Sequence, residues 1–251
     1  MRRILGSVAL GLSALVLSAA APAAAPAPAT AAQASKPSEA EAQAFLEAYS
    51  PPALRRAAEL DVLEKNFIPG LRSKPETADL LEAFPELGAE LEKALAGQID
   101  VFIAEFYEHF YPRAVPMVQQ SLSKADVRTL TEFYTSAEGR KLLDLASKNM
   151  DGKEVVARAV EDKPVDSGVA RRQAMRAGIR SFAGLTEPER AKVVAFMESP
   201  AGRHFKAFIP QMTALQVELM NGPSPRFEAA AGKAMGEAFK RVTGMDFPAG
   251  K

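Results

Sequence analysis

The chain has 251 residues, of which 47% are hydrophobic and 25% are charged, so it can bury a sizeable core and does not have a disordered composition. It carries 31 Lys and Arg against 31 Asp and Glu, and this balance argues against a nucleic-acid partner. The absence of cysteine excludes disulfides, thiolate metal sites and thiol nucleophiles.

The first 32 residues predict an export signal. Arg2 and Arg3 supply a basic start, residues 4–20 form an uncharged apolar run, and an Ala/Pro tract with small residues follows. Cleavage is expected between Ala29 and Gln33, and an uncleaved signal anchor is the alternative. An Ala/Pro-rich leader is typical of Gram-negative bacteria of high genomic GC content, so the predicted location is the periplasm.

Residues 33–84 predict short helices. Ser38 begins the first helix, and a second runs from Pro52 to about Phe67 and ends at Pro69. A third follows Pro75. Ala, Leu, Glu, Lys and Arg dominate here and beyond, and no stretch alternates with a period of two, so the fold class is all-α without β-sheet.

A long amphipathic helix is expected from Pro85 onward. Its apolar side chains recur every three or four residues, which is one stripe of an α-helix. The stripe consists of Leu87, Leu91, Leu95, Ile99, Phe102, Phe106 and Phe110. Pro112 and Pro116 are expected to bend or end this helix.

From residue 122 onward the sequence repeats itself, because residues 122–150 align with residues 185–212 at an offset of 63 positions. The aligned pairs are Leu122 with Leu185, Ser123 with Thr186, Asp126 with Glu189, Phe133 with Phe196, Ser136 with Ser199, Gly139 with Gly202 and Arg140 with Arg203. Such a pattern indicates one supersecondary unit used twice. We therefore expect a helical bundle built from tandem helix-corner-helix repeats.

Each copy is expected to begin with a capping box, in which a hydroxyl residue (Ser123 or Thr186) and the acidic residue three positions later cap one another. Ser136 and Ser199 then cap a second helix at a corner. Gly in the first turn of that helix, at positions 139 and 202, indicates close approach of two backbones. Burial is expected for Val127, Leu130, Phe133 and Tyr134 in one copy, for Val193, Val194, Phe196 and Met197 in the other, and for Phe205, Phe208, Ile209 and Met212 after the second corner.

These corner residues resemble a known family. Leu122-Ser123, followed by Phe133-Tyr134-Thr135-Ser136-Ala137-Glu138-Gly139-Arg140-Lys141-Leu142, is similar to the bacterial DUF2059 family (domain of unknown function 2059), whose hallmark is an aromatic pair, then Ser-Pro-x-Gly and a basic residue. The second copy, Ser199-Pro200-Ala201-Gly202-Arg203, has the proline that the first lacks, but Met197 replaces its second aromatic residue. The resemblance implies an exported helical bacterial protein with no assigned catalytic activity, and it supplies no active site.

The expected organisation follows from these patterns. The segments are 1–32 as signal peptide and leader, 33–84 as short helices, 85–150 as the first DUF2059-like unit, 151–222 as the second, and 223–251 as a C-terminal helix and tail. Phe227, Met235, Phe239 and Val242 predict the amphipathic face of that last helix.

Motifs of common enzyme classes are missing from the sequence, which has no Walker loop, no Gly-x-Ser-x-Gly elbow and no His-Glu-x-x-His. Glu105 and His109 share a helix face and could begin a metal site, but a helix-surface ion pair is the preferred interpretation. His204 is expected on the exposed side of its corner. The residues interpreted as structural are Ser136, Ser199, Arg140 and Arg203. We therefore expect no catalytic residue, no cofactor and no metal.

Two charge patterns remain. Arg172, Arg176 and Arg180 recur every fourth residue, with Arg171 beside them, and predict a basic ridge that is either a solvated face or a contact for anionic lipid headgroups or an acidic partner. Residues 33–121 carry a net charge of −7 and residues 122–251 a net charge of +5. Opposite charges favour docking of the two halves, within one molecule or between two.

The expected function is binding of an envelope protein or a lipid by a non-catalytic protein, through a groove or face between the repeat units. One alternative is a carboxylate-based envelope hydrolase, which a buried carboxylate pair facing a cleft would favour. Another is a passive homo-oligomeric structural protein, which its mass in solution would reveal.

Overall fold

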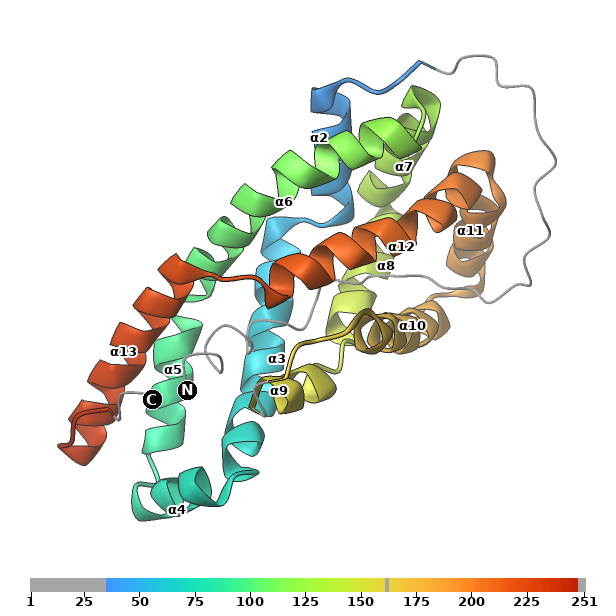
Figure 1. The fold of residues 1–251 in the computed structure, drawn as a ribbon. Helices are drawn as coiled ribbons and strands as arrows, with labels where there is room; N and C mark the ends of the chain where they lie inside the picture. Colours follow the sequence, from blue (N-terminus) through green and yellow to red (C-terminus); the bar gives the residue numbers. More distant parts are fainter. Residues whose placement is uncertain (1–34, 161–162, 248–251) are drawn as a thin grey trace.

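A computed structural model of the protein describes residues 35–160 and 163–247 (Figure 1). All regular structure in these two ranges is α-helical, without a strand, which confirms the predicted fold class. The predicted signal peptide lies outside the described residues. Among the helices of the described ranges, none combines the length and the apolarity that crossing a membrane requires.

The N-terminal helices begin where the local sequence predicts. They are α2 (Glu39–Tyr49), α3 (Pro52–Arg72), α4 (Pro75–Ala83) and α5 (Leu87–Ala96). Ser38 caps α2, because its Oγ accepts the N–H of Glu41 at 3.2 Å while the Glu41 carboxylate accepts the N–H of Ser38 at 2.8 Å. Pro52 occupies the first position of α3, where a missing N–H costs nothing.

One predicted helix end is wrong, and neither of the two prolines that were expected to bend or end a later helix ends it. The second helix does not stop near Phe67, because α3 continues through Pro69 for most of another turn and packs Ile68 and Leu71 against the core. Pro112 and Pro116 also lie inside a helix, α6 (Ile99–Ser121). Each proline removes one backbone hydrogen bond, and burial of the side chains around it offsets that loss.

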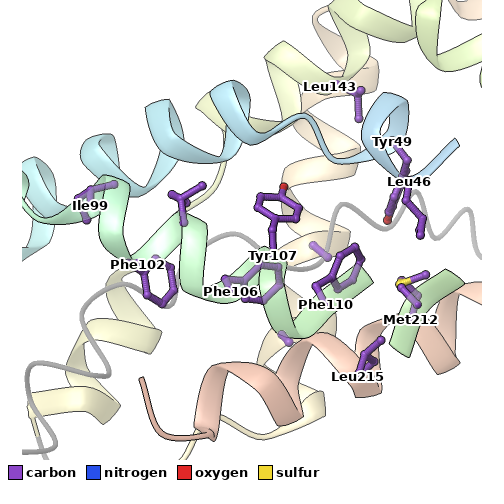
Figure 2. Packing of buried hydrophobic residues seen from close by; sticks show 14 of the residues in the cluster. Leu46, Tyr49, Ile99, Phe102, Phe106, Tyr107, Phe110, Leu143, Met212 and Leu215 are labelled. Carbon is purple, nitrogen blue, oxygen red and sulfur yellow. The ribbon is translucent and has the colours of Figure 1, made fainter. Parts of the chain in front are cut away.

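The long helix predicted from Pro85 is divided into α5 and α6. Gly97 and Gln98 form the break, with φ and ψ of −64° and −13° at Gly97 and of −105° and 0° at Gln98. The predicted apolar stripe nevertheless lies in the core on both sides of the break, as Figure 2 shows for Ile99, Phe102, Phe106 and Phe110. The stripe therefore predicted burial correctly although it did not reveal the turn.

The remaining helices follow the predicted corners. They are α7 (Lys124–Thr135), α8 (Ala137–Lys148), α9 (Lys153–Val160), α10 (Ser167–Ala183), α11 (Glu187–Glu198), α12 (Pro200–Asn221) and α13 (Pro225–Thr243). Figure 1 shows α2 lying across α6 and α7, α12 beside α6, and α13 along α5. The main hydrophobic cluster takes side chains from every helix named above except α9, whose Val155 and Val156 belong to two smaller clusters.

The two oppositely charged halves dock within one molecule. Ion pairs join Lys124 to Glu41 at 2.9 Å, Arg241 to Glu90 at 2.7 Å, and Arg226 to Glu108. Each of these pairs joins a basic residue of the C-terminal half to an acidic residue of the N-terminal half, as the charge division predicts.

Candidate functional site

The two aligned segments begin with matching backbone geometry. Ser123 has φ and ψ of −76° and 162°, and Thr186 has −68° and 163°. The Asp126 carboxylate accepts the N–H of Ser123 at 3.0 Å, and the Glu189 carboxylate accepts the N–H of Thr186 at 2.8 Å. Both acidic residues therefore reach back to the start of their helices, as a capping box requires.

The two corners also match. Ser136 Oγ accepts the N–H of Gly139 at 3.1 Å, and Ser199 Oγ accepts the N–H of Gly202 at 3.1 Å. Each hydroxyl donates in turn to a carbonyl of the preceding helix, at 2.7 Å for Ser136 and at 2.6 Å for Ser199. A Cβ on Gly139 would lie 2.0 Å from the Phe133 carbonyl oxygen, and a Cβ on Gly202 would lie 2.2 Å from the oxygen of Phe196. The close backbone approach expected from the glycines is therefore present at both corners.

Contacts between the two segments are reciprocal. Asp126 of the first segment bonds His204 Nδ1 of the second at 3.0 Å, and Glu189 of the second bonds Lys141 Nζ of the first at 2.8 Å. At the offset of 63 positions, Asp126 aligns with Glu189 and Lys141 aligns with His204. The two contacts therefore join equivalent pairs of positions, with the two segments exchanged. The sequence offered no local signal for either contact, because the partners are 78 and 48 positions apart.

The aromatic residues of the motif stack on one another. The rings of Phe133 and Phe196 lie 3.7 Å apart between centroids with an interplanar angle of 1°. Phe133 and Met197 are half-buried rather than buried, and Val194 is 41% exposed, which corrects the burial expected for all three. The physical reason for Val194 is that α11 packs on α12 and α8 and leaves this side chain on its outer face.

Ionisation at the capping boxes reflects these partners. Burial works to raise the pKa of the Asp126 carboxyl, but hydrogen bonds from Ser123 and His204 outweigh it and hold that pKa below its ordinary value. The hydrogen bond from Lys141, together with those from Thr186, lowers the pKa of Glu189 to about 2. Both carboxylates are therefore charged at neutral pH and serve as acceptors.

Ser123, Asp126 and His204 do not have the connectivity of a catalytic triad. Ser123 Oγ donates to Asp126 Oδ2 at 2.7 Å, and His204 Nδ1 lies 3.0 Å from each oxygen of the same carboxylate. In a triad the imidazole stands between the serine and the acid and removes the hydroxyl proton. Here the carboxylate stands in the middle, so the arrangement couples α7 to α12 and does not activate the hydroxyl.

The ion pair predicted between Glu105 and His109 is wrong. Glu105 is 2% exposed and accepts the N–H groups of Arg226 and Phe227 at 3.2 and 3.0 Å, whereas His109 is exposed. A carboxylate at the first turn of a helix satisfies N–H groups that have no partner within the helix, so Glu105 fixes the start of α13 against α6. Within residues 35–160 and 163–247, no three His, Asp or Glu side chains gather in a way that could hold a metal ion.

The predicted basic ridge lies on the exposed face of α10. Arg171, Arg172, Arg176 and Arg180 are exposed, and Met175 (38% exposed) and Ile179 (62%) lie among them. Arg172 bonds Glu154 of α9 at 2.9 Å. Arg140 and Arg203 are exposed at the two corners, and Arg203 donates to the carbonyl of Glu198. The α10 face is thus apolar and basic at once.

A groove runs beside this face, between α10 and the segment that joins α8 to α9. Its lining includes Asn149, Asp151, Glu154, Gln173, Arg176 and Arg180. Asp151 is exposed and Glu154 is half-buried and ion-paired, so the groove lacks the buried carboxylate pair that a hydrolase would favour. Neither the groove nor the exposed apolar residues had a signal in the sequence beyond the spacing of the arginines.

Comparison with protein-family models, with curated proteins and with solved structures finds no match to this chain. The resemblance to DUF2059 therefore rests on the corner residues.

Proposed function

We propose that this chain is an exported, non-catalytic helical protein that attaches to anionic lipid headgroups of the bacterial envelope through the exposed face of α10. The observation that carries the proposal is the exposure of Met175 and Ile179 on one face with Arg171, Arg176 and Arg180. A soluble helix normally turns such apolar side chains inward, whereas a helix at a membrane interface presents apolar residues flanked by cations.

The expected affinity can be worked out from these residues. Each Lys or Arg near an anionic surface contributes about 1 kcal/mol. Arg171, Arg176 and Arg180, which make no ion pair among the described residues, would contribute roughly 3 kcal/mol together. Burial of an Ile side chain adds about 1.5–3 kcal/mol, of which Ile179 would gain a large part. The total of about 5 kcal/mol corresponds to sub-millimolar binding, which is typical of a reversible peripheral contact.

Vesicle flotation of the mature protein tests this function. Vesicles containing phosphatidylglycerol should carry the protein upward, and pure phosphatidylcholine vesicles should not. The double variant Arg176→Glu and Arg180→Glu should abolish flotation, and Ile179→Ser should weaken it several-fold.

A matched control makes the same change in charge elsewhere. Arg140→Glu with Lys233→Glu alters exposed residues on α8 and α13 and should float like the unaltered protein. Equal loss in both double variants would mean that net charge, and not the α10 face, governs binding, and the proposal would be abandoned.

We also propose that α6–α8 and α10–α12 are two copies of one unit related by an approximate two-fold rotation, in keeping with the DUF2059 resemblance. The exchanged contacts of Asp126 and Glu189 support this, since a two-fold interface pairs each residue with its partner in both directions. The parallel rings of Phe133 and Phe196 support it as well, because equivalent residues meet on such an axis. Helix packing agrees, with α6 on α12 and α10 on α8.

An experimental structure tests the two-copy arrangement. The rotation that superimposes residues 122–142 on residues 185–205 should be near a half-turn and should also carry the second segment back onto the first. A rotation far from a half-turn would refute the two-fold relation while leaving the lipid proposal intact.

A further inference from the structure

Two hydrogen bonds show how the groove runs along α10. Asn149 Nδ2 donates to Ser181 Oγ at 3.3 Å, which places Asn149 near the C-terminal end of α10. Gln173 Nε2 donates to the carbonyl oxygen of Asp151 at 3.0 Å, which places Asp151 about two turns closer to the start of the helix. The groove, with a volume of ≈ 310 Å³, extends between these points.

Opposite charges line the two ends. Arg176 and Arg180 project from the C-terminal half of α10, and among the described residues neither makes an ion pair. At the other end the lining includes the carboxylates of Asp151 and Glu154 together with Lys153, and Glu154 also forms an ion pair with Arg172 at 2.9 Å. Positions 176 and 180 follow position 173 by three and seven residues, so the two arginines lie about 4.5 and 10.5 Å farther along the helix than Gln173, within reach of flexible side chains.

We infer that this groove binds the phosphoethanolamine group of a lipid, with the phosphate on Arg176 and Arg180 and the primary amine on Asp151 and Glu154. The inference rests on the proposed attachment of α10 to a lipid surface. Guanidinium groups bind phosphate oxygens through charged hydrogen bonds, and carboxylates accept hydrogen bonds from an ammonium group. A headgroup that carries both charges can bond to the arginines and to the carboxylates, whereas a headgroup with a phosphate alone can bond only to the arginines.

The same chemistry occurs in free phosphoethanolamine, and the location of the groove favours the lipid. Arg176 and Arg180 belong both to the groove and to the face that carries Met175 and Ile179. A headgroup held in the groove therefore keeps its acyl chains on the side where the apolar residues point. No such constraint applies to the free compound.

Vesicles of two compositions test the inference. Both contain the same fraction of phosphatidylglycerol, and the remainder is phosphatidylcholine in one and phosphatidylethanolamine in the other. The protein should bind the second about tenfold more tightly, the value of one charged hydrogen bond. The variant pair Asp151→Asn and Glu154→Gln should bind both compositions alike, and it should retain binding to phosphatidylglycerol.

Controls separate the headgroup from other causes. Glu76→Gln with Asp79→Asn, on α4, makes the same change in charge and should keep the tenfold preference. A preference that persists in Asp151→Asn with Glu154→Gln would come from bilayer packing and would overturn the inference. Free phosphoethanolamine added to the vesicles should release little protein, and full release at millimolar concentration would assign the groove to the soluble compound instead.

The outcomes distinguish the inference from the function on which it rests. Binding to phosphatidylglycerol without any preference for ethanolamine lipid refutes the groove as a headgroup site and leaves the α10 surface in place. Absence of binding to every anionic vesicle refutes both.

Discussion

The close approach of two helices at Gly139 offers a sharp test of the corner geometry. Gly139 of α8 approaches the end of α7 so closely that an added Cβ would lie 2.0 Å from the Phe133 carbonyl oxygen, 2.8 Å from its carbon and 2.9 Å from Tyr134 Cα. Carbon atoms normally pack at about 3.5–4.0 Å, so Gly139→Ala must separate the two helices by more than about 1 Å. All three atoms belong to the backbone, and none can move aside by a change of rotamer.

The magnitude follows from three terms. Overpacking costs about 1–3 kcal/mol, and movement at the corner also weakens the Ser136 cap, which is worth about 1 kcal/mol. Alanine recovers about 1 kcal/mol through its better helix propensity. We expect a net loss near the upper overpacking value, about 3 kcal/mol, which lowers the melting temperature of a chain of this size by roughly 6–12 °C.

Thermal and urea unfolding of the mature protein, followed by far-ultraviolet circular dichroism, measure the effect. Gly236→Ala is the matched control. Gly236 lies in the middle of α13, and an added Cβ there would lie 3.8 Å from its nearest neighbour, the Cβ of Phe247. The control should gain up to about 1 kcal/mol. A Gly139→Ala variant whose free energy of unfolding lies within about 0.5 kcal/mol of that of the unaltered protein would refute the close approach.

Three further results are expected. A double-mutant cycle of Phe133→Ala and Phe196→Ala should give a coupling of about 0.5–1.5 kcal/mol in urea unfolding, and additive effects would contradict the stack. Because the folded pKa of Glu189 is lowered to about 2, its carboxylate stabilises the fold above its ordinary pKa of 4.5, and this contribution is lost as the pH falls from about 4.5 to about 2. Glu189→Gln should therefore flatten that part of the curve of urea midpoint against pH, and an unchanged curve would contradict this role of Glu189. Glu105→Ala should lower the free energy of unfolding by about 2–3 kcal/mol, because two backbone N–H groups lose a charged acceptor. Amide hydrogen exchange should become faster first at the start of α13, and equally faster exchange along the whole chain would contradict this role.

The sequence by itself determined the features that depend on neighbouring residues. A capping hydroxyl and its acidic partner stand three positions apart, so Ser38 and Ser123 could be recognised as helix starts. Apolar spacing along one helix face identified core residues such as Phe102 and Phe110, since burial follows the period of the helix. The arginine spacing of α10 likewise located a basic face.

Only the tertiary structure decided the features that join distant positions. The pairing of Asp126 with His204 and the hold of Glu105 on the start of α13 bring together residues 78 and 122 positions apart, which no local pattern encodes. Packing also overrode local rules, because α6 continues through Pro112 and Pro116, where burial of the surrounding side chains outweighs the loss of a backbone hydrogen bond. Tertiary packing also determines that Ile179 is exposed. Spacing along a helix shows which residues share a face, but the neighbouring helices determine whether that face is covered.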